Sequence, residues 1–353
     1  MNNPLFYACE SCFGSMAEIY IDYLGGPDIA QLNLTNDDIL DAIEESLEAQ
    51  GNGKTAIEPR MHLQPSKAPT APEINGHFNV LRGYIEPMGL AGVKVVGDYV
   101  DNYKQGLRSE MALLNLFDPT NGKPLAVIDA SDITDMRTGA VTALGAKYLA
   151  RKGSKVLGHI GARGTSYWNV RLLDHLFDFD EIRVHSRRPE SREAFGTRLS
   201  KDLQKEVKVV DNWEECLVGA DIMVEASRLN EPMPLFKTDW IKEGCCVIPY
   251  GTMSALELSL TDIMSKIVMD DWGQAHAGPF GALRPHINAG KFSEENFYAN
   301  LGDIVAGHKP GRENEQEINL FWHRGLSLSD IALGQAMLKK AQKLGLGQKL
   351  RFA

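Results

Sequence analysis

The stretch Lys155 to Ser166, KVLGHIGARGTS, decides the fold of this 353-residue chain. Val156 and Leu157 open a short apolar run, which is typical of a buried strand in a parallel sheet. Glycines follow at positions 158, 161 and 164, and the residues after them carry apolar side chains at helical spacing. A strand, a glycine turn and a helix start form the geometry in which backbone N–H groups hold a pyrophosphate.

The glycine pattern departs from G-x-G-x-x-G, because Arg163 stands where the second glycine is usual. A helix that packs tightly on a strand would also explain these glycines. A second short strand, Glu181 to Val184, completes a β-α-β unit and favours dinucleotide binding. Strands and helices continue to alternate from 207 to 271, which predicts an α/β fold with a doubly wound parallel sheet.

The residues after the second strand indicate which coenzyme is bound. NAD enzymes place Asp or Glu there to bind the ribose 2′-hydroxyl, whereas NADP enzymes use Ser, Arg and similar groups. This chain reads His185-Ser186-Arg187-Arg188, without an acid. Two solvent-exposed arginines in a turn, without a role in binding, would also explain this sequence. Their position after the second strand nevertheless favours NADP(H), with NAD(H) as the alternative.

Composition limits the partners of this protein. Lys and Arg number 37 against 47 Asp and Glu, so the net charge is −10, which disfavours nucleic acid or an anionic membrane as the main partner. No apolar run approaches the roughly 20 residues that cross a bilayer. The first residues, MNNPLFYACESCF, lack the basic region of a signal peptide, so we expect a cytoplasmic protein.

The five cysteines do not predict a disulfide framework or a metal site. Cys9 and Cys12 form a C-x-x-C, but no second pair stands at zinc-ribbon spacing. Cys245 and Cys246 adjoin in a predicted strand, and we interpret them as core residues.

The rest of the chain surrounds the parallel unit with other elements. The first thirty or so residues have no clear period and resemble an extension or an arm against a partner. Thr35 to Asp38 reads as a capping box that starts a helix, which Gly51 or Gly53 ends. Residues 56–130 are strand-like, and 328–344 form a closing amphipathic helix.

Lys94 interrupts the otherwise apolar run GVKVV at 92–96. Cations on strands usually point to solvent, but burial at this place without a partner would be costly. Lys94 is therefore a candidate functional residue.

These pieces in this order resemble the ornithine cyclodeaminase/mu-crystallin family from about residue 35 to residue 344. The resemblance implies a homodimer with a Rossmann domain at 131–312. A second, α+β domain for substrate binding and dimerisation would come from both chain ends, 1–130 and 313–353. The blocks that carry the resemblance are EPRMH (58–62), GVKVVGDYVDN (92–102), ITDMRTGAVTA (133–143), IGARGTS (160–166), GDIVAGHKPGR (302–312) and EINLFWHRGLSLSDIA (317–332).

The resemblance also implies the site. Arg60, Lys94 and Arg137 would hold the substrate carboxylate, since Arg offers a planar bidentate fork and Lys a movable point charge. Lys94 and Arg137 are the predicted catalytic residues, and Lys94, or a water that it holds, is the candidate proton donor. Arg324 is a further candidate for substrate binding. The predicted coenzyme-binding residues are Gly161, Arg163, Gly164, Thr165, Ser166, Ser186, Arg187, Arg188, Ser227, Gly251 and His323.

Two departures from the family pattern bear on the reaction. Cyclodeaminases carry an Asp shortly after the glycine that is Gly251 here, and this chain lacks it, which weakens the case for ornithine deamination. Arg324 stands where a small or apolar residue is usual. It could pair with a second carboxylate on a dicarboxylic substrate, or bridge to a surface acid.

The expected function is NAD(P)H-dependent reduction of an imine of a 2-oxo acid to an amino acid, working reversibly. A redox-neutral cyclodeaminase with bound NAD is one alternative. A non-catalytic protein that keeps NADPH as a ligand, as crystallin-type members suggest, is the other.

Overall fold

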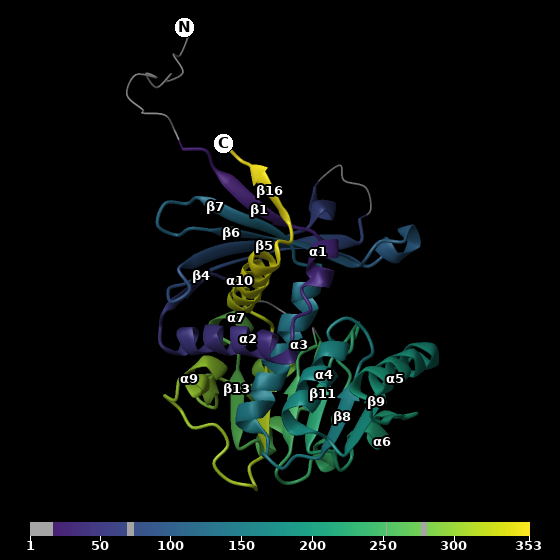
Figure 1. Cartoon of the computed structure of the whole chain (residues 1–353). Helices are drawn as coiled ribbons and strands as arrows, with labels where there is room; N and C mark the ends of the chain where they lie inside the picture. The colour runs from purple at the N-terminus through teal and green to yellow at the C-terminus, as the bar shows by residue number, and fades with distance from the viewer. Residues whose placement is uncertain (1–16, 69–73, 252, 277–280) are drawn as a thin grey trace.

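The computed structural model describes residues 17–68, 74–251, 253–276 and 281–353, and it contains two eight-stranded sheets. In Figure 1 the first sheet lies above the second, with α2 (Asn36–Gly51) and α3 (Ser131–Leu149) between them. Because α3 follows β7 (Pro124–Asp129) of the first sheet and precedes β8 (Val156–Ile160) of the second, it connects the two layers.

The first sheet is mostly antiparallel, and α10 (Ser327–Leu344) packs on one of its faces (Figure 1). Its strand order is β16-β1-β7-β6-β5-β4-β2, with β3 paired to β4. The strands are β1 (Tyr20–Leu24), β2 (Thr55–Ile57), β3 (Met61–Leu63), β4 (Gly76–Ile85), β5 (Leu90–Tyr99), β6 (Glu110–Phe117), β7 (Pro124–Asp129) and β16 (Gln348–Arg351).

The second sheet is wholly parallel among the described residues, as its buried apolar strands predict. Its order is β10-β9-β8-β11-β12-β15-β13-β14, so successive strands extend to one side of β8 as far as β10 and then to its other side from β11 onward. Ligands of such sheets bind outside the carboxyl ends of the strands at this point. The strands are β8 (Val156–Ile160), β9 (Glu181–His185), β10 (Val207–Val209), β11 (Ile222–Glu225), β12 (Cys246–Pro249), β13 (Lys266–Met269), β14 (Ala299–Asn300) and β15 (Asn319–Trp322).

Several predicted elements are confirmed. The Thr35 hydroxyl accepts from the Asp38 backbone N–H at 3.0 Å, and the Asp38 carboxylate accepts from the Thr35 N–H at 2.9 Å. Cys245 and Cys246 are buried core residues. The remaining helices are α1 (Gly26–Gln31), α4 (Ser166–Phe177), α5 (Pro189–Leu203), α6 (Trp213–Leu217), α7 (Trp272–His276), α8 (Arg284–Asn288) and α9 (Leu301–Val305).

Two expectations differ from the structure. β1 lies between β16 and β7, so part of the supposed N-terminal extension is an inner strand of the first sheet. β15 lies between β12 and β13, so the boundary expected at residue 313 wrongly assigns this strand to the first sheet's domain. Most of the supposed arm, with Cys9 and Cys12, lies outside the described residues. No helix in the described ranges is both long enough and apolar enough to cross a membrane.

Candidate active site

Lys94 lies on the inward face of β5 and is only 1% exposed. Its ammonium Nζ lies 2.6 Å from Oδ1 of Asp330 on α10 and donates to the Thr134 hydroxyl at 3.1 Å. The buried lysine therefore has the partner that its burial requires. Asp330 is a site residue that was not predicted from the sequence.

Asp330 holds two of the predicted site residues together. The same oxygen, Oδ1, accepts from Nε of Arg137 on α3 at 2.9 Å. Asp330 is fully buried, and its other oxygen, Oδ2, has no hydrogen-bond partner among the described residues. One carboxylate thus fixes two cations from two elements, β5 and α3.

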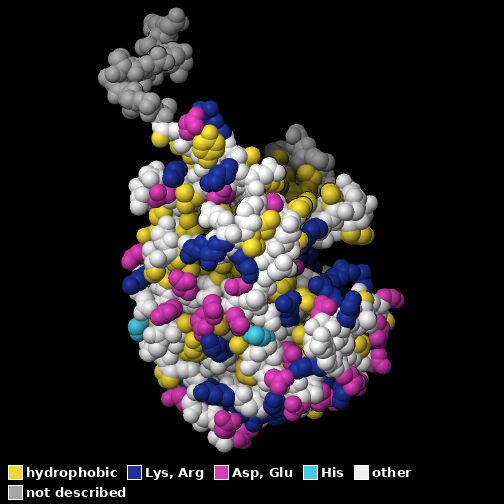
Figure 2. Space-filling model, in the orientation of Figure 1, with side chains coloured by type: hydrophobic (Ala, Val, Ile, Leu, Met, Phe, Trp, Pro, Cys, Tyr) yellow, Lys and Arg dark blue, Asp and Glu magenta, His cyan; other side chains and the backbone are white. Residues whose placement is uncertain are grey.

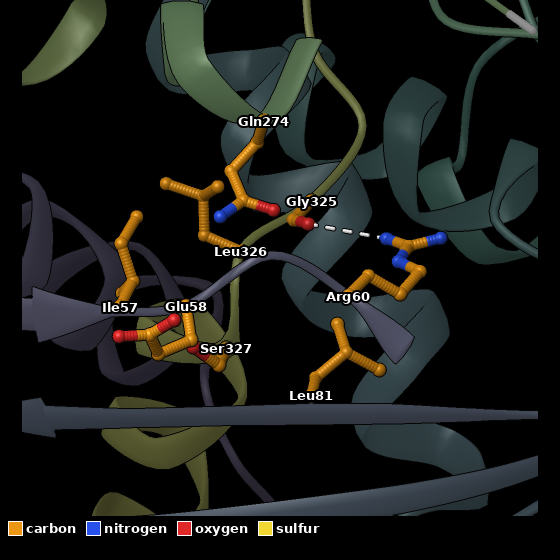
Figure 3. Close-up of a pocket in the computed structure, with 8 residues that line it drawn as sticks. All are labelled: Ile57, Glu58, Arg60, Leu81, Gln274, Gly325, Leu326 and Ser327. Atoms are coloured by element: carbon orange, nitrogen blue, oxygen red, sulfur yellow. Dashed lines mark hydrogen bonds between the residues drawn. The ribbon is translucent and has the colours of Figure 1, made fainter. Parts of the chain in front are cut away.

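Arg60 joins this group through Gly325. Its Nη2 donates to the Arg324 carbonyl at 3.0 Å and to the Gly325 carbonyl at 3.3 Å, and Figure 3 shows the second of these bonds. Gly325 has φ +81°, and a Cβ there would lie 1.7 Å from Nη1 of Arg137. Only glycine fits this position, and it brings the Arg60 and Arg137 guanidiniums to either side of one turn.

A pocket opens beside Arg60 (Figure 3). Its lining combines apolar side chains with the turn that carries Gly325. The other lining residues are Ile57, Glu58, Leu81, Gln274, Leu326 and Ser327.

Burial sets the protonation behaviour of the cluster. Loss of solvation lowers the pKa of Lys94 to about 8, although the Asp330 carboxylate opposes this shift. Loss of solvation, with repulsion from Arg324 and Arg137, lowers the pKa of Arg60 to about 10. Lys94 is therefore the member of the cluster able to exchange a proton near neutral pH.

The glycine turn after β8 has the geometry of a phosphate cradle. Gly161 has φ +113°, and a Cβ there would lie 2.6 Å from the Ala226 carbonyl that follows β11. Gly164 also has a positive φ, of +53°. The Ser166 hydroxyl at the start of α4 is buried and has no hydrogen-bond partner among the described residues. These residues fit a dinucleotide pyrophosphate, because a phosphate oxygen would satisfy the orphaned hydroxyl.

A ring stack connects this turn with the charged cluster. The hydroxyls of Thr165 and Tyr250 are hydrogen-bonded, and Asn169 donates to the Tyr250 hydroxyl at 2.7 Å. The Tyr250 ring stacks on the His323 ring with centroids 4.7 Å apart. Burial lowers the pKa of His323 to about 3, so this imidazole is neutral at physiological pH. The stack contributes shape rather than a proton, and Tyr250 is a residue that sequence reasoning missed.

Glu225 ties together the loops after β11 and β12. Its Oε1 accepts from the Ser227 N–H at 2.7 Å and from the Ser227 hydroxyl at 2.5 Å, and its Oε2 accepts from the Gly251 N–H at 3.2 Å. Both partners are predicted coenzyme residues. A Cβ on Gly251 would lie 2.6 Å from the same Oε2, so this glycine permits the close approach.

We expect Glu225→Gln to weaken coenzyme binding about tenfold or more, because an amide leaves one donor of this network unmatched. Burial raises the pKa of Glu225 to about 7, so the carboxylate becomes protonated as the pH falls below 7. Coenzyme affinity of the wild type should therefore fall below pH 7, and this dependence should be absent from Glu225→Gln.

Fluorescence titration with NADPH across pH measures both effects. Glu243→Gln, at an exposed glutamate, is the control, and equal behaviour of the two variants would contradict the role of Glu225.

The predicted ribose residues lie at the end of β9. Arg187 and Arg188 are exposed, and Nη2 of Arg187 lies 3.5 Å from the Arg228 carbonyl. Arg163 is also exposed. Figure 2 shows Lys and Arg side chains gathered at the edge of the molecule above α5, the helix that begins directly after Arg188.

The Arg324 backbone is fixed by a buried acid. Asp270, which follows β13, accepts from the N–H groups of Arg324 and Gly325 at 2.8 and 2.7 Å. The half-buried Arg324 side chain directs Nη1 to the Gln274 carbonyl at 3.4 Å. This places Arg324 beside the Arg60 pocket, whose lining includes Gln274 and Gly325.

The structure thus gathers the predicted residues in three groups. Lys94 and Arg137 meet at Asp330, and Arg60 bonds the backbone of Arg324 and Gly325, whereas the Arg324 side chain points to the Gln274 carbonyl. Gly161, Gly164, Thr165 and Ser166 form the helix start, and Tyr250 links them to His323, while Ser227 and Gly251 share Glu225. Arg163, Ser186, Arg187 and Arg188 stay apart at the solvent-exposed edge.

Comparisons with known proteins identify the family of this chain. The model of the ornithine cyclodeaminase/mu-crystallin family matches residues 27–344. Alanine dehydrogenase of Archaeoglobus fulgidus is 30% identical over 323 residues, which cover 90% of this chain and 95% of that protein. Delta(1)-pyrroline-2-carboxylate reductase of Thermococcus litoralis, solved with NADH and L-proline, is 29% identical with a TM-score of 0.85 and covers 94% of this chain and 100% of its own. An archaeal alanine dehydrogenase dimer with bound NAD has the same identity and TM-score and covers 95% and 100%.

Proposed function

This chain belongs to the ornithine cyclodeaminase/mu-crystallin family, and we propose that it is an NAD(P)-dependent oxidoreductase that reversibly reduces the imine of a 2-oxo acid to an amino acid. One observation carries the proposal. Lys94 and Arg137 share the buried Asp330, and Arg60 meets Arg137 across Gly325, so a titratable amine lies within a carboxylate-binding cluster.

The chain's own residues would position the substrate and move one proton. Arg60 and Arg137 bind the carboxylate and orient the neighbouring carbon. Lys94 gives its proton to the imine nitrogen in reduction and takes it back in oxidation. Gly161, Gly164, Thr165 and Ser166 would hold a nicotinamide coenzyme, whose chemistry would be hydride transfer to the imine carbon, or from the α-carbon of the amino acid in the reverse direction. The imine carbon would gain the hydride and the imine nitrogen the proton, which together give the amine.

Coenzyme absorbance with a panel of substrates tests the proposal. NADPH and NADH are offered with cyclic imines and with 2-oxo acids plus ammonia or methylamine, and we expect consumption of coenzyme. Ornithine with NAD runs in parallel. Ammonia released without net coenzyme change would replace the proposal by cyclodeamination. Tight coenzyme binding without turnover in any arm would favour the non-catalytic alternative.

NADP(H) is the coenzyme that we propose, and Ser186, Arg187 and Arg188 support it because they bring no acid to the ribose position. We expect Arg187→Ala/Arg188→Ala to lower the ratio of kcat/KM for NADPH to that for NADH about tenfold to a hundredfold. Arg198→Ala, at an exposed residue on α5, is the matched control. A wild type that prefers NADH would contradict this part of the proposal.

A homodimer formed through the first sheet's domain is also part of the proposal. Exposed apolar side chains occur on β1, β3, β6 and β16, whereas α10 covers the inward face of the sheet. Figure 2 shows hydrophobic side chains on this upper part of the molecule. Analytical ultracentrifugation measures the assembly state. The residues concerned are Tyr20, Met61, Leu63, Met111, Leu113 and Leu350.

A further inference from the structure

We propose that Asp135 binds the two hydroxyls of the ribose in the nicotinamide half of the coenzyme. This inference rests on the proposed function, because it assigns a further residue to the coenzyme site of the same reaction. It follows from the position of a half-buried carboxylate that borders the phosphate cradle and has no partner among the described residues.

Asp135 lies on the side of α3 that packs against α4. Gly139, one turn later on the same face, lets the helices approach so closely that a Cβ on it would lie 2.5 Å from Cβ of Trp168. Oδ1 of Asp135 lies 3.4 Å from the position of a Cβ on Gly164, just before α4 begins. The carboxylate therefore borders the turn that leads to the buried, unpartnered hydroxyl of Ser166.

Asp135 differs from the neighbouring acids because it has no partner. Among the described residues it takes part in no hydrogen bond or ion pair, whereas the two nearest cations on its own side are each held by another acid. Arg108 pairs with Asp132 at 2.8 Å, and Arg137 pairs with Asp330 at 2.9 Å. The oxygens of Asp135 are thus left for a group from outside the chain.

Asp135 is charged at neutral pH. Loss of solvation and repulsion from Glu110 raise its pKa to about 6, although Arg108 opposes this shift. Arg228 lies 3.3 Å from Glu110, and Arg163 is exposed without an ion pair in the described ranges, so neither is bound to Asp135. At about pH 7.5 the carboxylate only accepts hydrogen bonds, and a matching ligand must supply donors.

The second ribose of a dinucleotide supplies these donors. The phosphates cannot, because their oxygens are acceptors and carry negative charge. A ribose has two adjacent hydroxyls, and dinucleotide-binding folds use a carboxylate in the same way to bind the adenosine ribose. Asp135 would therefore bind sugar hydroxyls next to a pyrophosphate on the α4 start.

The position of α3 selects the nicotinamide half. The adenosine half of a dinucleotide lies towards the end of β9, where Ser186, Arg187 and Arg188 stand. α5 packs on α4 together with β9 and β10, whereas α3 packs on α4 together with β12 and β15 (Figure 1). Since these strands lie on opposite sides of β8 and β11, a pyrophosphate at the start of α4 separates the adenosine from the half that reaches Asp135.

Two diphosphate ligands of equal charge test the inference. ADP-ribose carries the second ribose, and the β-methyl ester of ADP replaces it by a methyl group. Each is titrated calorimetrically into the protein at about pH 7.5, with and without an adenosine 2′-phosphate, because coenzyme preference is a separate proposal. We expect the wild type to bind ADP-ribose at least about tenfold more tightly than the methyl ester, and Asp135→Ala to lose most of this ratio. Asp41→Ala, at an exposed acid of α2, is the matched control and should keep it.

Thermal unfolding without ligand separates binding from a structural role. Because folding raises the pKa of Asp135, its charged form is less favourable in the folded protein than in the unfolded chain above about pH 6. Asp135→Ala should therefore keep or raise the Tm at the pH of the titrations. A lower Tm with an equal loss of affinity for both ligands would assign Asp135 a structural role and overturn the inference.

The outcomes also separate this inference from the proposed function. A ratio that Asp135→Ala leaves unchanged would overturn the inference even if the wild type reduces imines. If that variant only raises KM for the amino acid, Asp135 binds the substrate amine instead, which also overturns it. A wild type that consumes no coenzyme with any imine fails the proposed function, but a ligand ratio lost in Asp135→Ala would still support the ribose contact.

Discussion

Asp330→Asn is expected to lower the free energy of unfolding by about 3–5 kcal/mol and to reduce kcat/KM by at least about a hundredfold. The substitution keeps the size of the side chain but removes the charge that Lys94 and Arg137 share at 2.6 and 2.9 Å. Two buried cations would then repel each other without a counter-ion, so the carboxylate-binding geometry would be lost. Urea denaturation and steady-state kinetics measure the two effects.

Two further variants separate this effect from a general loss of charge. Asp180→Asn, at an exposed residue 3.7 Å from Lys155, should change stability by less than about 0.5 kcal/mol. Asp330→Asn/Lys94→Met should recover part of the lost stability, because one of the two unpaired buried cations is gone. It should recover no activity, because the proposed proton donor Lys94 is absent. If Asp330→Asn is as stable as the exposed control, Asp330 does not hold the cluster.

The sequence allowed the burial of Lys94 to be inferred, but not its partner. The run GVKVV is local, and a lysine within it implies a buried counter-ion. Asp330 carries the corresponding signal, because it is an acid between the apolar residues Leu328 and Ile331 of α10. The two residues are separated by 236 positions, and nothing local specifies that β5 and α10 pack together. The same holds for Glu225 and Tyr250, whose roles depend on contacts between loops of different strands.

The wrong assignment of two strands, β1 and β15, has a similar cause. β1 is a five-residue strand whose partners are β7 and β16, which lie more than a hundred residues away. β15 is a short buried strand that inserts between β12 and β13, although it follows both in the chain. Periodicity within a segment predicts that a strand exists, whereas its sheet depends on non-local pairing. The β-α-β unit was predictable because its handedness and order are fixed by short connections.

Lys94→Met is expected to reduce kcat about a hundredfold to ten-thousandfold, because the imine nitrogen loses its proton donor. Asp330 keeps Arg137 as its partner in this variant, so the protein should still fold. Burial lowers the pKa of Lys94 to about 8, and this gives the two directions opposite pH profiles. Reduction needs the protonated amine, so its kcat/KM should fall above pH 8. Oxidation needs the neutral amine, so its kcat/KM should rise up to about pH 8. Stopped-flow measurement of coenzyme absorbance in both directions records the profiles.

Lys94→Arg tests whether the charge or the proton of Lys94 matters. The guanidinium keeps a positive charge for the carboxylate but stays protonated throughout the accessible pH range. If Lys94 is the donor, the variant should bind substrate with little change in KM, yet lose the inflection near pH 8 in both directions together with most of kcat. If Lys94 only binds the carboxylate, the arginine should keep kcat, and the methionine should raise KM while the inflection near pH 8 persists. An inflection that survives in Lys94→Met would assign the proton to another group.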